Sequence, residues 1–550
     1  MKEIHMSDNT IALGIELSTQ SAKWIALEIK TARVIASASI AYDQTFPAYE
    51  TVGGVLKSPD TQRRESPTLM FLDALDEIFS SMVRHDIELS RVASIKCDAQ
   101  QHATVYAADT LARRLSSIDP SSSLASALSP CLTRKHSPIW EDRTTESETQ
   151  DLTNRFAGDG GIQATTGNRA ELRFPAAQIL KWAKESPEQY AKTSHIMLLS
   201  AFVTSALAGV VAPVDTGDGW GTNLNSIDID QPAFSERAIK ALSEQIAADI
   251  GENGLQAPSS VPLAEQYQDL LGGQLGRMVA YDRPIGPVSS YFVEKYGLAP
   301  DATVLAGTGD NPATLLGCGD GALVSLGSSY TVCGPMDEVH PENGASYNIF
   351  GYRPGLAMAL AVITNGGKLH RQFCDTYAGG DWERYADLAG GSIQVPEEEP
   401  LMLPYLSDES VPVAKAGIVR DGFAESDAQA NVRALHISQV ASLRLHSRHL
   451  SDVTRLCVVG GGASNRFIRQ ALADAFGAIT YTITNAEFAA PYGAAMSAAR
   501  YALGAGYEEV SERFVKSDPG SECHPSPENV ELFDKIIARY AKLESDHLSK

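Results

Sequence analysis

The chain opens with Ile11-Ala-Leu-Gly-Ile-Glu-Leu17, then Ser18-Thr-Gln-Ser21, then Lys23-Trp-Ile-Ala-Leu-Glu-Ile29, and this stretch decides the fold. Two short runs rich in apolar and β-branched residues flank a small polar loop, which is the pattern of a β-hairpin. A third run at residues 33–42 alternates in hydrophobicity and predicts the next strand. The chain is therefore expected to begin with three strands, the first two joined by a loop of small polar residues.

A helix and a buried strand are expected next. Ser66 is the type of residue that caps a helix, and Pro67 suits the first helical position. Apolar residues behind it recur at helical spacing. The run at 92–97 then predicts a buried strand, which ends in Asp98-Ala-Gln-Gln-His102. The order is hairpin, strand, helix, strand and polar loop.

The second half of the chain repeats that order. Its counterparts are hairpin strands at 322–326 and 330–333, a third strand at 355–364, a helix at 428–450 and a strand at 455–459. Repetition of a whole run of elements predicts an internal duplication. The expected fold class is therefore α/β, with two similar halves.

Each half places a Ser, Thr and Gly-rich loop between two strands. Such a loop offers backbone N–H groups and hydroxyls to an anion. Either loop alone is more simply explained as a tight hairpin turn. Two such loops that face each other would hold a polyphosphate between two lobes.

Composition limits the classes of function. The chain has 550 residues, 43% hydrophobic and 21% charged, with a formal net charge of −23. This excess of acidic residues argues against a nucleic-acid partner. No apolar stretch reaches the roughly 18 residues that a membrane span needs, and the first ten residues lack the apolar segment of a signal peptide. Seven cysteines without CxxC spacing predict reduced thiols in a cytoplasmic protein.

The motifs resemble those of the FGGY carbohydrate kinases from about Ile11 to Gly504. The stretches that carry the resemblance, in the family's order, are 13–20, 100–102, 137–142, 166–170, 215–223, 307–313, 325–329 and 460–465. The resemblance implies a two-lobed actin/hexokinase-like (ribonuclease H-like) fold, with duplicated domains around a central cleft. It also implies a mainly sugar-binding lobe at 10–318 and a mainly ATP-binding lobe at 319–550.

The activity implied by the resemblance is ATP- and Mg²⁺-dependent phosphorylation of D-xylulose to D-xylulose 5-phosphate. A kinase of another ketose or polyol (ribulose, fuculose or glycerol) is the alternative, because the residues do not fix one stereocentre. A non-catalytic actin-like nucleotide switch and a structural scaffold are alternatives from other classes. The expected partners are a small sugar and ATP, with no nucleic acid and no membrane, in a monomer or homodimer.

Asp310 is the candidate general base. A carboxylate within hydrogen-bond reach of the attacking hydroxyl can orient it and accept its proton. Asp310 follows a predicted strand and Gly307-Thr-Gly309, and these glycines permit close approach of a ligand. From spacing alone Asp310 is better explained as a helix N-cap, and the match to the family's Gly-Asp motif favours catalysis.

The remaining site residues follow from the resemblance. The sugar is expected to contact Gln101, His102, Arg169, Asp310 and Asn311. The ATP site is expected to contain Ser18, Thr19, Gln20, Gly327, Ser328, Trp382, Gly461, Gly462 and Asn465. Glu16 stands where many members have Asp, so a water-mediated contact with Mg²⁺ is expected rather than direct ligation. No function is assigned to segment 108–134 or to the C-terminal tail.

Overall fold

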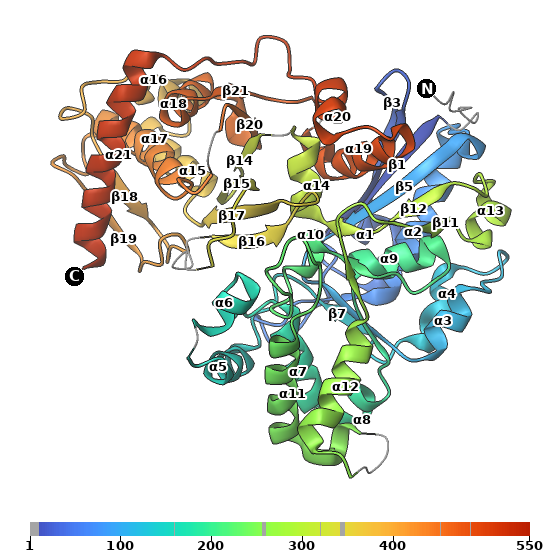
Figure 1. The fold of residues 1–550 in the computed structure, drawn as a ribbon. Coiled ribbons are helices and arrows are strands. Elements are labelled where there is room, and N and C mark those ends of the chain that lie inside the picture. Colours follow the sequence, from blue (N-terminus) through green and yellow to red (C-terminus); the bar gives the residue numbers. More distant parts are fainter. Residues whose placement is uncertain are drawn as a thin grey trace.

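The computed structural model describes residues 10–158, 160–255, 260–319, 321–341, 347–450, 453–484 and 486–549. Within these residues, two mixed sheets carry the fold, one in each half of the chain (Figure 1). Helices cover both sheets, and a group of further helices extends the first half at the bottom of the view.

The first sheet has the order β11-β12-β5-β1-β2-β3, with β13 beside the end of β5. Its strands are β1 (Ile11–Leu17), β2 (Ser21–Glu28), β3 (Arg33–Ala41), β5 (Val92–Ala99), β11 (Pro284–Pro287), β12 (Thr303–Leu305) and β13 (Thr308–Gly309). The first three are antiparallel neighbours, whereas β5 runs parallel to β1, and β12 parallel to β5. The predicted strands at 11–17, 33–42 and 92–97 are confirmed.

The second sheet repeats this pairing, in the order β16-β17-β15-β14-β20-β21. Its strands are β14 (Ala322–Leu326), β15 (Tyr330–Met336), β16 (Asn348–Gly351), β17 (Ala357–Ile363), β20 (Arg455–Val459) and β21 (Ile479–Tyr481). The strands β14, β15 and β17 are antiparallel, and β20 and β21 continue in parallel from β14. The predicted duplication is confirmed, with β14, β15 and β17 in the places of β1, β2 and β3.

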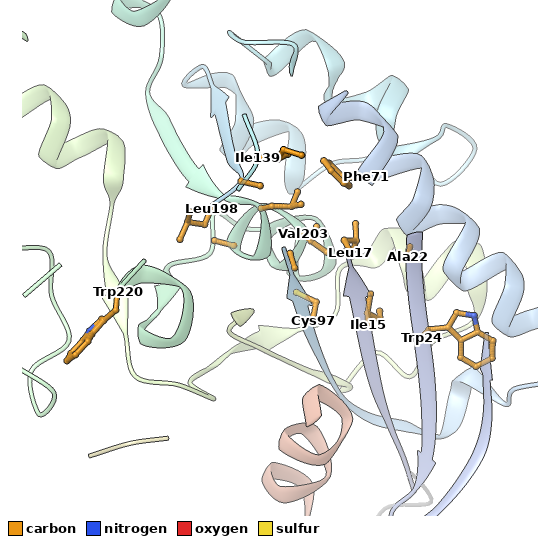
Figure 2. Close-up of a cluster of buried hydrophobic side chains, with 14 of the residues drawn as sticks. Ile15, Leu17, Ala22, Trp24, Phe71, Cys97, Ile139, Leu198, Val203 and Trp220 are labelled. Atoms are coloured by element: carbon orange, nitrogen blue, oxygen red, sulfur yellow. The ribbon is translucent and has the colours of Figure 1, made fainter. Parts of the chain in front are cut away.

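Apolar side chains fill the space between the first sheet and the helices α2 (Thr68–Arg84) and α9 (Leu199–Ala208). Figure 2 shows Ile15 and Leu17 of β1 on the side of Phe71 and Val203. Successive residues of a strand point to opposite faces, so Gly14 faces the other way. A Cβ at Gly14 would lie 1.8 Å from the carbonyl oxygen of Pro491, in α19 (Ala489–Leu503).

The helices α14 (Asp310–Gly317) and α19 cross in close contact between the two sheets. A Cβ at Gly317 would lie 2.0 Å from the Ala489 carbonyl oxygen, and one at Gly493 would lie 1.9 Å from that of Ala313. Glycine is required at both places because the two backbones touch. Helix α19 belongs to the second half of the sequence, yet it packs on β1 and β5 of the first sheet.

The predicted lobe boundary after residue 318 stays a prediction.

In the second half, α17 (Ala428–Leu445) packs against α18 (Arg466–Phe476), α16 (Trp382–Ala389) and α15 (Gly367–Ala378). The tail forms α21 (Pro527–Leu548), whose buried residues include Phe533, Ile537 and Tyr540. This face contacts α17 and α18, so the tail packs on its own half of the chain.

The remaining helices of the first half lie outside the sheet, and residues 108–134 form two of them. Leu111 and Leu115 of α3 (Thr110–Leu115) and Leu124 and Leu128 of α4 (Leu124–Leu128) are buried, and α4 contacts α2. This segment therefore enlarges the core. The others are α1 (Tyr42–Thr45), α5 (Glu146–Arg155), α6 (Gly161–Thr166), α7 (Pro175–Glu185), α8 (Pro187–Ala191), α10 (Thr216–Gly219), α11 (Glu236–Ile250), α12 (Leu263–Leu275) and α13 (Ser290–Tyr296).

Short elements complete the described structure. These are the strand pairs β4 (Glu65–Pro67) with β7 (His136–Pro138), β6 (Thr104–Ala107) with β8 (His195–Leu198), β9 (Val214–Asp215) with β10 (Met278–Val279) and β18 (Met402–Tyr405) with β19 (Gly417–Arg420), and the helix α20 (Tyr507–Phe514). None of the described helices is long and apolar enough to cross a membrane.

The predicted Ser66 cap is wrong. The helix begins at Thr68, after Pro67, and Ser66 belongs to strand β4. Its hydroxyl donates to the Gly54 carbonyl oxygen at 2.8 Å instead of capping the helix. Pairing of β4 with β7 draws this residue into a strand, which the local sequence does not reveal.

Candidate active site

Asp310 is the first residue of α14, directly after β13. The N-cap position belongs to Gly309, and no side chain caps the helix. The structure therefore does not support the alternative explanation of Asp310 as the cap. Burial, aided by the charge of Glu16, raises the pKa of Asp310 to about 7, although N–H groups of Gln101 and Asn311 oppose the shift. A carboxyl with this pKa is suited to accept a proton near neutral pH.

Gln101 and Asn311 form a chain of hydrogen bonds with Asp310. The Asn311 amide donates to Gln101 Oε1 at 2.6 Å and to Asp310 Oδ1 at 3.1 Å. Gln101 Nε2 donates to the Gly217 carbonyl oxygen at 3.1 Å, in α10. A Cβ at Gly309 would lie 2.5 Å from the Gln101 side chain, so glycine is needed here. Three of the five predicted sugar residues are thereby joined in one network.

His102 lies directly after Gln101, with a backbone φ of 69°. Its ring stacks on Phe174 at a centroid distance of 4.4 Å, and Nδ1 lies 2.8 Å from the Gly221 carbonyl oxygen. Because a carbonyl only accepts, Nδ1 carries the proton. Burial and the nearby charge of Arg173 lower the pKa of His102 to about 3. The ring is thus neutral, and its Nε2 is a hydrogen-bond acceptor.

Arg173, which the sequence analysis did not single out, is the arginine whose charge helps to lower the pKa of His102. Arg169 Nε donates to Glu171 Oε1 at 2.7 Å, and its side chain is 43% exposed. Arg173 has a buried Nε without a hydrogen-bond partner among the described residues. Burial lowers its pKa, and the charges of Arg143 and Arg169 add to this. Arg173 is therefore the more buried of the two arginines, and both line the same cavity, so the contact of Arg169 with the sugar stays a prediction.

Carboxylates gather near the ends of β1 and β5. Glu16 pairs in register with Asp98 of β5 and with Lys23 of β2, whose Nζ lies 2.9 Å from its carboxylate. Both oxygens of Asp98 are buried without a hydrogen-bond partner among the described residues. Burial, with the charges of Glu16 and Asp310, raises the pKa of Asp98 well above its usual range. Asp98 ends a predicted strand, and that position is the signal that could have revealed it.

The first polar loop is the turn between β1 and β2. The Ser18 N–H donates to the Ser21 carbonyl oxygen at 3.0 Å, as in a tight turn. Thr19 Oγ1 donates to Gln100 Oε1 at 3.1 Å and accepts from Trp140 Nε1 at 2.9 Å. Gln20 is exposed. Trp140 therefore fixes the loop against the segment that follows β7.

The second polar loop borders a cavity of about 710 Å³. The carbonyl oxygen of Gly327 accepts from the Gly367 N–H at 3.0 Å, so the start of α15 supports the loop. The predicted ATP residues that line this cavity are Gly327, Ser328, Trp382, Gly461, Gly462 and Asn465. One cavity thus brings together every residue predicted for ATP in the second half. Asn465 also caps α18, accepting from the Phe467 N–H at 2.9 Å.

Aromatic side chains form one wall of this cavity. Trp382 is 45% exposed, and the Arg371 guanidinium lies 4.8 Å from its ring centre. Tyr385 lies 2.8 Å from His370 Nδ1, and His436 stands edge-on to His370 at 4.6 Å. Burial lowers the pKa of His370 to about 3 and that of His436 to about 4, so both rings are neutral. The sequence analysis missed these two histidines, which lie in helices far from the glycine motif.

A second cavity, of about 360 Å³, has walls from both halves of the chain. Trp140, which holds the first polar loop, lines it together with Ser329 of the second loop. Arg143, Arg169 and Arg173 also line it. The second polar loop therefore borders this cleft through Ser329, and the first loop reaches its lining through the hydrogen bond from Trp140 to Thr19.

The chain is similar to known proteins in both sequence and fold. Residues 322–502 match the C-terminal domain of the FGGY family of carbohydrate kinases. The xylulose kinase of Rattus norvegicus is 29% identical over 554 residues, which cover 98% of this chain and 97% of that protein. Solved structures of a gluconate kinase and a ligand-bound xylulose kinase, both from Lactobacillus acidophilus, superpose with TM-scores of 0.75 and 0.74. Each is 18% identical, covering 98% of this chain and 98% of its own.

The duplicated sheets, the cleft between them and these similarities define a carbohydrate kinase with the two-lobed actin/hexokinase-like fold. The chain is similar to the FGGY family of carbohydrate kinases, whose C-terminal domain matches residues 322–502. Its full-length similarity is to xylulose kinases, over both halves of the chain. The fold and enzyme class expected from the sequence are therefore confirmed.

Proposed function

We propose that this chain transfers the γ-phosphoryl group of ATP to D-xylulose, giving D-xylulose 5-phosphate, with Asp310 as the general base. The observation that carries the proposal is the placement of Asp310. Its carboxyl, with a pKa of about 7, heads α14 and is joined through Asn311 to Gln101. The similarity to xylulose kinases over 98% of the chain supports D-xylulose as the acceptor.

In the proposed reaction, the acceptor hydroxyl attacks the γ-phosphorus, and the bond from phosphorus to the β,γ-bridging oxygen breaks. Asp310 accepts the hydroxyl proton as the new O–P bond forms, and ADP leaves. Positioning and charge neutralisation account for most of the catalysis in such transfers. The neutral His102 accepts a hydrogen bond from a sugar hydroxyl at Nε2, and Arg173 donates to sugar oxygens.

The nucleotide is proposed to span the two cavities. Its base would lie against Trp382 in the 710 Å³ cavity, with Gly461 and Gly462 beneath the ribose. Its phosphates would extend between Ser18 to Gln20 and Gly327 to Ser328. Glycine at position 462 suits this site because a Cβ there would lie 2.8 Å from Leu326 Cβ.

Mg²⁺ would neutralise phosphate charge when it is bound with ATP. The described residues contain no group of three or more His, Cys, Asp or Glu side chains placed to hold a metal ion. Glu16 is already paired with Lys23 at 2.9 Å. Mg²⁺ usually keeps several waters and is held mainly by substrate phosphates. We therefore propose a water-mediated contact from Glu16.

A sugar acid is the second candidate acceptor. Arg143, Arg169 and Arg173 all line the 360 Å³ cavity, and arginines of this kind bind carboxylates well. Asp142 and Glu171 also line this cavity, so its three arginines exceed its acids by one in a chain whose net charge is −23.

The test is a coupled ADP-release assay with ATP and Mg²⁺ across D-xylulose, D-ribulose, L-fuculose, glycerol and D-gluconate, with a no-acceptor control. Turnover highest with D-xylulose supports the proposal. Turnover highest with D-gluconate would identify the arginines as carboxylate ligands and replace the proposed acceptor. Sedimentation of the same sample would decide between the predicted monomer and homodimer.

The cytoplasmic location remains a prediction. All seven cysteines are free and buried in the structure, which suits a reducing compartment.

A further inference from the structure

Lys96, in the middle of β5, is a charged residue that the proposed reaction does not use. Its side chain is 0% exposed. Its Nζ donates to the Ala306 carbonyl oxygen at 2.7 Å and lies 3.5 Å from Asp215 Oδ2 and 3.4 Å from Asp282 Oδ1. It also stands 4.0 Å from the centre of the Tyr281 ring. Such burial is tolerated only when the charge is paired and hydrogen-bonded, so every one of these contacts matters.

One contact of Lys96 holds the segment that leads to Asp310. Ala306 directly precedes Gly307, Thr308 and Gly309, and α14 begins at the next residue. Gly307 is itself tightly enclosed, because a Cβ there would lie 2.5 Å from Thr204 Oγ1. The hydrogen bond from Lys96 therefore fixes the point at which the chain enters the catalytic turn.

A second contact holds α10, the turn beneath the sugar residues. Asp215 caps α10, with Oδ1 accepting from the Asp218 N–H at 3.1 Å. Among the described residues, Lys96 is the one cation that lies within 4 Å of the Asp215 carboxylate. Burial raises the pKa of Asp215 to about 6, and the charge of Lys96 opposes this shift. Lys96 thereby favours the ionised cap.

The turn at α10 in turn orients the sugar-facing side chains. The Gly217 carbonyl oxygen accepts from Gln101 Nε2 at 3.1 Å, and that of Gly221 accepts from His102 Nδ1 at 2.8 Å. The second of these bonds sets which nitrogen of His102 carries the proton. A shift of α10 would consequently move Gln101 and change the direction of the His102 acceptor.

The third contact of Lys96, with Asp282, differs from the other two because Asp282 has further partners of its own. Asp282 Oδ2 accepts from Arg500 Nε of α19 at 3.0 Å and from the Tyr507 hydroxyl at 2.5 Å. Asp282 thus keeps a cation when Lys96 is removed, whereas Asp215 does not. Removing Lys96 would therefore displace chiefly α10 and the segment before Asp310.

We propose that Lys96 is a positioning residue for the acceptor: it fastens the segment entering Asp310 and the α10 turn to one point of β5, and so sets the distance between the general base and the sugar-facing side chains. The inference rests on the proposed function of this site, although not on which sugar is the acceptor. The nucleotide cavity shares none of these contacts, so the effect is specific to the acceptor side.

The test is Lys96→Met, which keeps the length of the side chain and removes its charge and donor. The acceptor used is whichever one the wild-type protein turns over best, so a wrong sugar does not count against Lys96. We expect kcat/KM for the acceptor to fall about 100-fold, as small misplacements of reacting groups do. The KM for ATP and the affinity for ADP should remain those of the wild type.

Ser94→Ala is the matched control, two residues earlier on the same face of β5. Ser94 is fully buried and donates to the Ala498 carbonyl oxygen of α19 at 2.7 Å, but it does not touch either acceptor segment. We expect it to lower thermal stability without changing the KM for the acceptor. An acceptor-specific loss in Ser94→Ala equal to that in Lys96→Met would overturn the proposal, as would a Lys96→Met protein that loses only thermal stability.

Two further variants keep the proposal open to refutation if Lys96→Met does not fold. Lys96→Met/Asp215→Asn removes the unpaired carboxylate while leaving Oδ1 to cap α10, and it should show the same acceptor-specific loss. Asp215→Asn alone retains Lys96 with Asp282 and should show a smaller loss of the same kind. Wild-type kinetics in either variant would contradict the role assigned to Lys96.

Discussion

The two polar loops occupy equivalent places in the duplicated fold, yet their surroundings differ in chemistry. The loop after β1 adjoins buried carboxyl groups with raised pKa values, among them Glu16, Asp98 and Asp310. The loop after β14 adjoins a cavity walled by glycine backbone, Trp382 and the neutral His370 and His436. The first half therefore places buried carboxyl groups beside its loop, whereas the second lines its cavity mostly with glycine backbone and neutral rings, with Lys368 and Arg371 as its charged residues.

This difference indicates how the duplicated halves divide the work. A buried carboxylate with a raised pKa is useful where a proton must move. An aromatic and glycine-lined wall is useful where a flat, uncharged group must be held. The comparison predicts that variants on the acceptor side alter the chemical step and its pH dependence, and that variants around the second cavity alter nucleotide binding.

The largest expected effect comes from Asp310→Asn. We expect kcat to fall about 1,000-fold, within the range that general-base catalysis contributes. Affinity for ADP, measured by calorimetry, should be unchanged. The variant should also be no less stable than the wild type at pH 8, because it removes a carboxyl whose burial disfavours its ionised form.

Asp119→Asn, at an exposed acid between α3 and α4, is the control for Asp310→Asn and should keep full activity. Equal loss of ADP affinity and of thermal stability in Asp310→Asn would make Asp310 a structural residue, and the comparison between the two halves would fail.

The pH profile is the next test of the acceptor side. The base must be ionised, and the pKa of Asp310 is raised to about 7. The ionised fraction is lost as pH falls through 7, so kcat/KM should decrease about tenfold per pH unit below that point. His102 does not titrate in this window, because its pKa is lowered to about 3. A limb centred near pH 4 would show that the carboxyl keeps its ordinary pKa.

The smallest expected effect lies at the nucleotide cavity. Trp382→Ala should raise the KM for ATP about tenfold, as expected for loss of a stacked base, with kcat at saturating ATP unchanged. Arg371→Met, which removes only the cation 4.8 Å from the Trp382 ring, is the matched variant and should have a weaker effect. A fall in kcat without a change in KM would place Trp382 in the chemistry rather than in binding.

Local pattern predicted most of the fold. The hairpins after Ile11 and Ala322 and the strand at 92–97 all appear where their periodicity and turn residues place them. Ser66 was the exception, because its pairing partner in β7 lies well along the chain. Patterns in a single sequence say least about contacts between distant segments.

The features of the candidate site also fall into those that the local sequence predicts and those that depend on distant contacts. The sequence alone determined the duplicated order of strands, the two polar loops and the Gly-Asp turn at Asp310, since each depends on neighbours in the chain. Tertiary structure decided that Arg173 rather than Arg169 is buried near His102, and that α19 packs on the first sheet. It also decided that the charge of Lys96 meets Asp215 and Asp282. Burial and pairing are properties of the packed chain, because they depend on which distant segments exclude water from a side chain.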